Sequence, residues 1–226
     1  MEHFFLKMAV MLVPGLMAIT CHEVSHGFVA DKLGDGTARY MGRLTLNPIK
    51  HIDIFGTLML FVVGIGWAKP VPVNFGNLRN PKRDMIWVAA AGPVTNFLLA
   101  IVSAMALRAL VAMAGSLPDD AMAMRVFDPV ILMLAFSVYV NLLLAIFNLI
   151  PVPPLDGGRV AVGLLPYRQA VLWSKIEPYG MIIIIALVFF TDVFSHVISP
   201  MLDYGVRTLA GPHSKLVFSV TRFIAR

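Results

Sequence analysis

The feature that most constrains this chain of 226 residues is a set of apolar runs long enough to cross a lipid bilayer. A spanning helix needs about 20 consecutive apolar residues. Four segments meet this requirement with at most one acidic residue each: residues 8–30, 86–107, 129–150 and 178–198. We therefore expect an all-α polytopic membrane protein with at least four transmembrane helices.

The composition agrees with this expectation. Hydrophobic residues make up 58% of the chain and charged residues 14%, with a mean hydropathy of +0.81, whereas a soluble domain carries about 25% charged residues. The single cysteine, Cys21, excludes an internal disulfide and a paired-cysteine metal site. The net charge of +5 accompanies no nucleic-acid-binding motif, so we expect the lipid bilayer, and no nucleic acid, as a partner.

Two further segments are expected to contact the membrane without crossing it. Residues 54–66 are apolar, but these 13 residues are too few to span and include three glycines, which favours a re-entrant segment. The tail, residues 199–226, is too polar to span, and its apolar and basic pattern predicts an interfacial helix after Gly211. No linker is long enough to separate another domain, so residues 1–226 are expected to form a single membrane-embedded domain.

The connection between the first two spans predicts a small layer at the membrane surface. Turn-forming residues surround a β-like patch at residues 43–46. In residues 68–75, AKPVPVNF, Pro70 and Pro72 exclude helix and favour extended backbone. We expect a layer of β and extended structure here; an ordinary connector is the alternative.

The first span contains a motif that carries chemistry, Cys21-His22-Glu23-Val24-Ser25-His26. Histidines four residues apart lie on one face of a helix, about 6 Å apart along its axis, so His22 and His26 can bind one metal ion. Glu23 is then placed to act as general base on a water molecule at that metal. An ionisable group at membrane depth costs at least about 2 kcal/mol unless it is paired or faces water, which favours a functional site over a polar patch between helices.

A catalytic zinc site usually has three protein ligands and one open position, so the two histidines need a partner from elsewhere in the chain. Asp156 is the candidate that stands out. It follows Pro151, Pro153 and Pro154, which stop the preceding helix, and it precedes two glycines that let the backbone approach a site closely. Four other candidates lie near span ends or in loops: His3, His51, His196 and His213. Asp192 lies far along the last span.

A third polar group lies at the start of the second span, in the sequence AGPVTN. Gly92 permits close helix packing, Pro93 frees a backbone acceptor, and Asn96 puts an amide inside the bilayer. The amide of Asn96 either serves helix packing or donates a hydrogen bond to a substrate carbonyl or oxyanion. The sequence leaves both interpretations open.

In this order, HEVSH, GPVTN and NLIPVPPLDGGR resemble the motifs of the site-2 protease family of intramembrane zinc metalloproteases. The stretch from GRLTLNPIKHIDIFGT through GWAKPVPVN to NPKRD is similar to the compact prokaryotic branch of that family, which lacks a PDZ domain. The resemblance covers most of residues 18–159. It implies a zinc metalloendopeptidase of a prokaryotic cell membrane that hydrolyses a peptide bond in or near a transmembrane segment of a membrane-protein substrate.

The resemblance also implies the roles of individual residues. Three of them would bind one zinc ion per chain: His22, His26 and Asp156. Glu23 would be the catalytic base. The asparagines of the family fall on Asn96 and Asn148, which are candidates to contact substrate or to stabilise the oxyanion.

A shared site requires the ends of three spans to lie on one face of the membrane. The connection between the first two spans must then return to the side it left, which a re-entrant segment at residues 54–66 allows. On this topology, the two loops on the face of the site, residues 31–84 and 151–177, hold 8 and 3 of the 18 Lys and Arg residues. These 11 basic residues outnumber those on the opposite face. Because basic residues are enriched in cytoplasmic loops, the difference favours an active site nearer the cytoplasmic face.

Other interpretations use the same residues differently. A membrane metal transporter would also place His and Asp in the bilayer, but it needs ligands on both faces. A zincin with its active site in a cytosolic domain would need a glutamate as third ligand, and only Glu177 is available. A catalytically silent zinc-binding relative is the third alternative, and the intact Glu23 argues against it.

Overall fold

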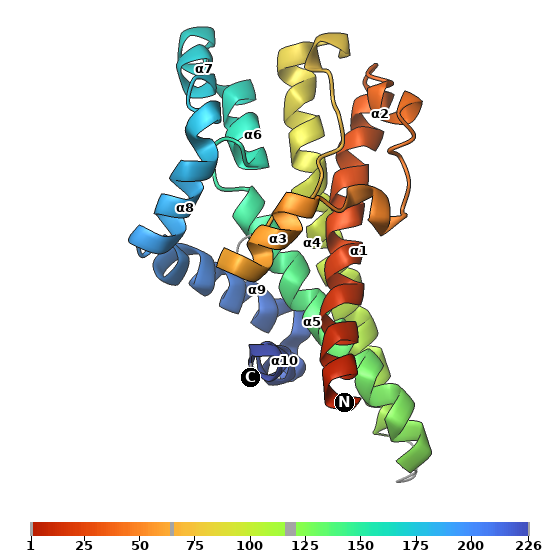
Figure 1. Ribbon diagram of the computed structural model, residues 1–226. Helices are drawn as coiled ribbons and strands as arrows, with labels where there is room; N and C mark the ends of the chain where they lie inside the picture. The colour runs from red at the N-terminus through yellow and green to blue at the C-terminus, as the bar shows by residue number, and fades with distance from the viewer. Residues whose placement is uncertain (1, 64–65, 116–120, 226) are drawn as a thin grey trace. The chain divides into compact units, whose positions relative to one another are not determined.

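The protein is described by a computed structural model that covers residues 2–63, 66–115 and 121–225. Within these residues the chain forms helices joined by turns and loops, and no strand occurs (Figure 1). The α-helices of this part of the chain are α1 (Glu2–Lys32), α2 (Thr37–Tyr40), α3 (Ile54–Val63), α4 (Pro81–Ala114), α5 (Ala121–Asn148), α6 (Asp156–Leu164), α7 (Tyr167–Ser174), α8 (Gly180–Phe190), α9 (Ser199–Ala210) and α10 (Ser214–Ala225). Short 3-10 or π-helical turns occur at Pro48–His51, Phe75–Asn77, Glu177–Tyr179, Phe194–Ile198 and Gly211–His213.

Four helical stretches are long and apolar enough to cross a membrane: Phe4–Lys32, Pro81–Ala114, Phe127–Asn148 and Tyr167–Phe190. Each of them overlaps one of the four apolar runs of the sequence. They confirm the expected helical membrane architecture with four candidate spans.

The fourth span differs from its predicted limits at both ends. It begins at Tyr167, where α7 starts, and it ends with α8 at Phe190, eight residues before the predicted end at residue 198. Thr191 follows α8 in an extended conformation (φ −129°, ψ 159°), and its hydroxyl donates to the carbonyl of Leu187. A hydroxyl that bonds to the preceding turn competes with helix continuation, so the apolar run is not one helix to its end.

The strands predicted for the surface layer do not form in the described residues. The β-like patch at residues 43–46 lies in a loop, and so do residues 66–74, which we call the extended segment. Pro70 and Pro72 lack an N–H, so a regular ladder cannot continue through them. Hydrogen bonds with side chains, together with the backbone bond from Lys69 to His51, hold the extended segment instead.

The predicted re-entrant stretch, residues 54–66, contains the ten-residue helix α3. Ile54 and Phe55 on this helix are 81% and 74% exposed. Apolar side chains this exposed suit contact with lipid. Re-entry into the bilayer stays a prediction, and residues 64–65 of the stretch lie outside the described part of the chain.

Two compact units make up the chain. The first unit comprises residues 1–18, 96–146 and 193–226, and the second unit comprises residues 19–95 and 147–192. The division therefore passes through α1, α4 and α5. The expectation of a single membrane-embedded domain stays a prediction.

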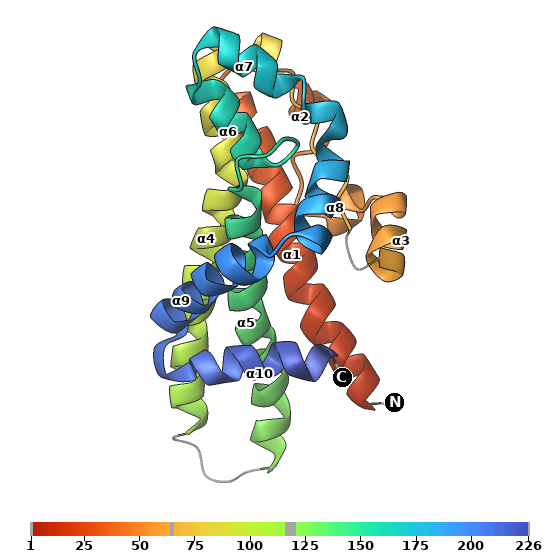
Figure 2. The same cartoon turned by 90° about the vertical axis from the view of Figure 1, so that its left-hand side faces the viewer.

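The first unit is a helical bundle with an apolar core. Its buried residues come from five helices: Val10, Ala100, Ala104, Leu107, Ala135, Val138, Leu142, Leu202, Val206, Ala210, Val217 and Val220. In this unit α9 and α10 run across α4 and α5 rather than along them (Figure 2). The tail therefore buries one apolar face of each helix against protein, with Val206 and Val217 fully buried. Its location at a membrane interface stays a prediction.

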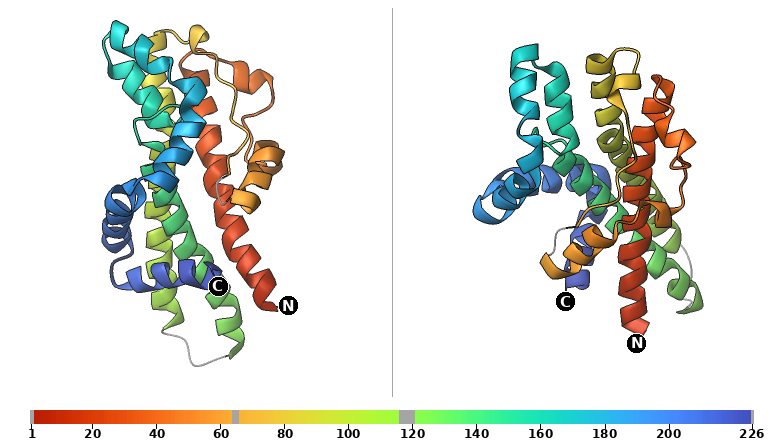
Figure 3. Two further views of the ribbon diagram at one scale, coloured as in Figure 1. Left: turned by 60° about the vertical axis from the view of Figure 1, so that its left-hand side comes forward. Right: turned by 45° about the horizontal axis from the view of Figure 1, so that its top comes forward.

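In the second unit the extended segment lies next to α1 and leads into α4 (Figure 3). Asp35, just after α1, fastens the far end of this segment. Its fully buried carboxylate accepts the backbone N–H of Asn74 at 2.7 Å and the side-chain amide of Asn77 at 2.9 Å, as well as the N–H and hydroxyl of Thr37. Burial alone would raise the pKa of Asp35, but these donors lower it below its ordinary value.

Candidate metal centre

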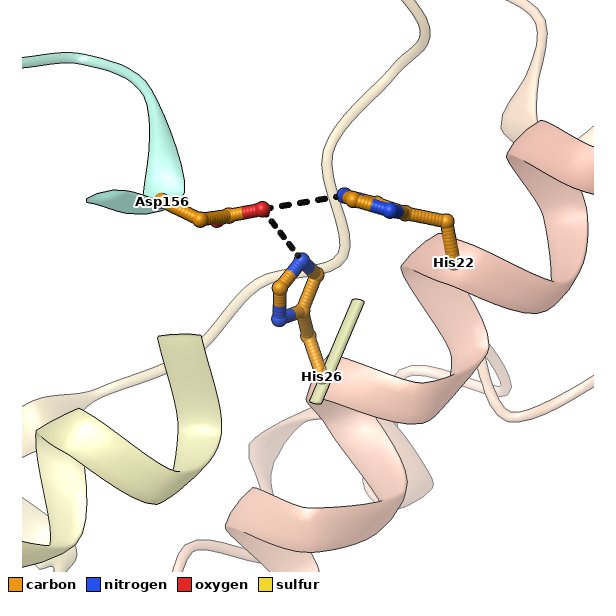
Figure 4. Close-up of side chains that lie close together, drawn as sticks. All are labelled: His22, His26 and Asp156. Atoms are coloured by element: carbon orange, nitrogen blue, oxygen red, sulfur yellow. Dashed lines mark ion pairs between the residues drawn. The ribbon is translucent and has the colours of Figure 1, made fainter. Parts of the chain in front are cut away.

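Three side chains of the second unit converge on one point. His22 and His26 project from one face of α1, and Asp156 is the first residue of α6 (Figure 4). Nε2 of His22 lies 3.0 Å, and Nε2 of His26 lies 3.3 Å, from Oδ2 of Asp156. All three ligand atoms lie within 4.8 Å of one another, and all three residues are buried. The structure therefore brings together the three residues that the sequence suggested as metal ligands.

Two glycines allow the start of α6 to reach this point. A Cβ on Gly157 would lie 2.2 Å from the carbonyl oxygen of Leu149, and a Cβ on Gly158 would lie 2.4 Å from the backbone nitrogen of Pro153. Any other residue would push the first turn of α6 away from the loop that follows α5. The proline and glycine pattern around Asp156 thus has a direct structural purpose.

The orientation of His26 is set by the main chain of α4. Its Nδ1 lies 2.7 Å from the carbonyl oxygen of Val88. A carbonyl can only accept, so Nδ1 carries the proton and the lone pair remains on Nε2. This is the tautomer and orientation that a metal-binding histidine requires.

A buried carboxylate oxygen at the centre lacks a hydrogen-bond donor among the described residues. Oδ2 of Asp156 is buried and makes no hydrogen bond within the described residues, although both imidazoles are close to it. Burial alone would raise the pKa of Asp156, and the two neighbouring imidazoles lower it below its ordinary value. A carboxylate oxygen and an Nε2 lone pair facing each other without a donor fit a bound cation. Two imidazoles and one carboxylate are a ligand set that zinc takes in catalytic sites.

Gly92 on α4 leaves room for the centre. A Cβ at this position would lie 2.4 Å from Nε2 of His26 and 2.6 Å from Nε2 of His22. Real side chains do not come so close, so any larger residue would displace the rings. The sequence suggested close helix packing as the reason for Gly92. The structure shows that Gly92 packs against the side chains of His22 and His26.

Glu23 lies beside this pair on α1 and is partly buried. Its Oε2 accepts a hydrogen bond of 2.9 Å from the backbone N–H of Val71 in the extended segment. Nothing in the sequence indicated this contact, because the two residues are 48 positions apart and the donor is main chain.

The two asparagines fall in different units. Asn96 belongs to the first unit, where it is fully buried and donates its amide to the carbonyl of Ala18 at 3.1 Å and to Oδ1 of Asn141 at 2.8 Å. These two bonds favour the packing role over the oxyanion role for its N–H groups. Asn148 ends α5 in the second unit and is partly buried. Asn141 was not among the residues predicted from the sequence, although a polar residue within an apolar span is a usable signal.

The remaining ligand candidates do not join the centre. Within the described residues, the only group of three or more possible ligands is His22, His26 and Asp156. The others are in no such group: His51, Glu177, Asp192, His196 and His213. The side chain of His3 lies outside the described residues.

Comparison with known proteins gives a consistent result. The sequence profile of peptidase family M50 matches residues 109–191. The chain is 40% identical over 208 residues to "Putative zinc metalloprotease YwhC" of Bacillus subtilis, an alignment that covers 88% of each chain. It is 31% identical over 190 residues to "Putative zinc metalloprotease Rip2" of Mycobacterium tuberculosis, covering 79% of this chain and 66% of the relative. The protein of the same name from Mycolicibacterium smegmatis is 30% identical over 178 residues, covering 76% of this chain and 63% of the relative. No solved structure matches the chain.

Proposed function

Because this chain belongs to peptidase family M50, the site-2 protease family, we propose that it is an intramembrane zinc metalloendopeptidase. It cleaves a peptide bond in or near a transmembrane segment of a membrane-protein substrate. The observation that carries the proposal is the convergence of His22, His26 and Asp156 beside Glu23. The relatives are named as zinc metalloproteases, which is why we propose zinc as the metal.

In this proposal His22, His26 and Asp156 would hold one zinc ion per chain. Zinc in such a site supplies Lewis acidity, which activates a water molecule and polarises the carbonyl of the bond to be cut. The bond from Nδ1 of His26 to the Val88 carbonyl fixes the ring for this task. Gly92 keeps the ligand side of the histidine pair clear of side-chain atoms.

Glu23 is the general base of the reaction. Its carboxylate takes a proton from the attacking water and passes it to the nitrogen of the leaving amine. General base catalysis of this kind contributes about 100- to 10,000-fold to a rate. Asn148 remains our candidate for stabilising the oxyanion. Asn96 is the weaker candidate, because its side-chain N–H groups already donate to Ala18 and Asn141.

The substrate is proposed to be a membrane protein because the site is built on a membrane helix. His22, Glu23 and His26 lie within the candidate span Phe4–Lys32. A helical substrate hides its carbonyls in its own hydrogen bonds, so it must unwind before it can be cut. The extended segment is a candidate edge for an unwound strand, on which Pro70 and Pro72 limit the available N–H groups. A re-entrant α3 would lie on the same side of the membrane as this edge.

We further propose that the protein resides in a prokaryotic cell membrane with the centre nearer the cytoplasmic face. The excess of Lys and Arg in residues 31–84 and 151–177 supports this orientation if α3 is re-entrant.

Cleavage of a single-span substrate by the purified protein in detergent tests the proposal. Wild type and Glu23→Gln are compared, with bound zinc measured in both. We expect wild type to cut, and the variant to retain zinc while losing cleavage by about 100- to 10,000-fold. Zinc binding by both proteins without cleavage of several substrates would favour a metal transporter or a silent relative.

A further inference from the structure

The extended segment contacts Glu23 through a single backbone group. The N–H of Val71 donates to Oε2 of Glu23 at 2.9 Å. Its neighbours on both sides, Pro70 and Pro72, have no N–H, so Val71 is the only main-chain donor in this stretch of three residues. Val71 is only 7% exposed, which shields its peptide from competing water.

Arg43 holds the same peptide group from its other side. Its Nη2 donates to the carbonyl of Lys69 at 2.9 Å and to the carbonyl of Pro70 at 3.3 Å. The carbonyl of Pro70 and the N–H of Val71 belong to one planar amide. A charged donor on the carbonyl polarises that amide and strengthens its N–H as a donor. The guanidinium of Arg43 and the carboxylate of Glu23 are therefore connected through one peptide.

The surroundings of Arg43 suggest that this connection is its task. The residue is 9% exposed, its Nε is buried without a partner, and no carboxylate of the described residues pairs with it. A buried guanidinium without an anion is costly. The guanidinium donates to the carbonyls of Lys69 and Pro70. The buried charge therefore fixes the position of the Pro70–Val71 peptide.

Other contacts fasten the extended segment on either side of this peptide. The N–H of Lys69 donates to the carbonyl of His51 at 2.9 Å. The N–H of Asn74 donates to Asp35 at 2.7 Å. Loss of the Arg43 contacts would therefore disturb the Pro70–Val71 peptide more than the course of the whole segment.

We propose that Arg43 is a positioning residue, which acts through the Pro70–Val71 peptide to fix the carboxylate of Glu23 for proton transfer. The inference rests on the proposed function, in which Glu23 is the general base. A glutamate has a long side chain with several rotamers, and a fixed donor on one carboxylate oxygen restricts them. Misplacing a catalytic group by about 1 Å costs about 100-fold in rate, so a contact remote from the reacting atoms can have a large effect.

Arg43→Gln and Val71→Pro test the two halves of this connection. Gln removes the charge and the forked donor, and Pro removes the N–H in a segment that already has extended backbone. We expect each variant to lower kcat by about 10- to 100-fold with KM within about threefold of wild type and with zinc retained. The double variant should be no slower than Val71→Pro alone, because both changes act through one peptide. Arg43→Lys, which keeps a charged donor, should recover part of the loss.

Two matched substitutions serve as controls. Arg39→Gln makes the same change in an arginine that is exposed and pairs with Asp31. Arg168→Gln makes the same change in another exposed arginine, on α7. Both controls should keep kcat within about twofold of wild type.

Wild-type kcat in Arg43→Gln and Val71→Pro would overturn the proposal, and so would losses that multiply in the double variant. Equal losses in the two controls would also overturn it. Loss of zinc or of folded protein in both Arg43→Gln and Arg43→Lys would assign Arg43 to folding rather than positioning. A wild-type protein that binds zinc and cleaves nothing would instead contradict the proposed function itself.

Discussion

The two units each bury a polar cluster, and the clusters differ in whether their donors and acceptors are matched. In the first unit, Asn96 donates to Asn141, Asn141 donates to the backbone and hydroxyl of Ser137, and this hydroxyl pairs with that of Ser103 at 2.8 Å. We call these four residues the polar ladder. It joins α4 to α5 by bonds in which donors meet acceptors.

In the second unit, the metal centre shows the opposite arrangement. His22, His26 and Asp156 bring their ligand atoms within 4.8 Å, and Oδ2 of Asp156 makes no hydrogen bond within the described residues. Matched polar groups inside a bundle stabilise and orient helices. Unmatched lone pairs at similar burial cost free energy unless a ligand satisfies them. The comparison favours a structural role for the polar ladder and a metal-binding role for the candidate metal centre.

The largest effect is expected from removing a ligand of the metal centre. Asp156→Ala should lower zinc affinity by more than about 100-fold, because changes outside the ligand set already cost about 10- to 100-fold. Cleavage should fall to background. Zinc content after dialysis, measured by elemental analysis, checks this, with Asp203→Ala in the exposed Asp203–Arg207 pair as the control. Full zinc content in Asp156→Ala would break the assignment of chemistry to this cluster.

A smaller but sharper effect is expected from Gly92→Ala. The new Cβ would lie 2.4 Å from Nε2 of His26, so the rings must shift and zinc affinity should fall at least about tenfold. Alanine is the better helix former by about 1 kcal/mol, so the helix itself should not suffer. Gly15→Ala is the matched control, because a Cβ there meets nothing within 4 Å. Equal zinc affinity in both variants would show that space at Gly92 is not needed.

The polar ladder should respond in stability rather than in chemistry. Asn141→Ala leaves partners of Asn96 and Ser137 unmatched, and such bonds between membrane helices are worth about 1–2 kcal/mol. We expect a lower unfolding temperature in detergent and unchanged zinc content.

Asn96→Ala distinguishes the two roles considered for that residue. If it belongs only to the polar ladder, the variant loses stability to a similar extent and keeps kcat within about fivefold. A fall in kcat of about 100- to 1,000-fold would instead mark it as an oxyanion donor, and would blur the contrast between the two clusters.

The smallest effect concerns Asp35, a third buried polar group, which resembles the polar ladder in being satisfied. Its folded-state pKa is lowered, so the stabilisation is present above its unfolded pKa of about 4 and is lost as the pH falls through the folded value. The unfolding temperatures of wild type and Asp35→Asn, measured between pH 7 and pH 3, should therefore converge in acid. Asp128→Asn, at an exposed acid, should show no such convergence. A constant difference between wild type and Asp35→Asn across this range would contradict the expectation.

The sequence predicted the candidate spans and the three residues that converge at the candidate metal centre, because both leave local signals. Apolar runs of about 20 residues and an HExxH spacing are readable within one helix. Asp156 was found through the proline and glycine residues that surround it. The early end of α8 was not predicted, because the apolar run continues past Thr191 whereas the helical conformation ends before it.

Contacts between distant residues were beyond the sequence. The strands expected near residues 43–46 do not form, because the N–H groups of Arg43 and Thr45 donate to nearby carbonyls in the same part of the chain. The bond from Val71 to Glu23 joins residues 48 positions apart through a main-chain donor. Gly92 was recognised as a packing residue, but only the fold shows that it faces the histidine pair.

X-ray absorption spectroscopy of the zinc-loaded protein at the zinc edge tests the central claim most directly. We predict a zinc ion bound only by nitrogen and oxygen at about 2.0–2.2 Å, with two imidazoles and one carboxylate. In Glu23→Gln the spectrum should retain both imidazoles. A sulfur ligand at about 2.3 Å would contradict the proposed centre; Cys21 is the one cysteine of the chain that could supply it. A spectrum unchanged by Asp156→Ala would also contradict the proposed centre.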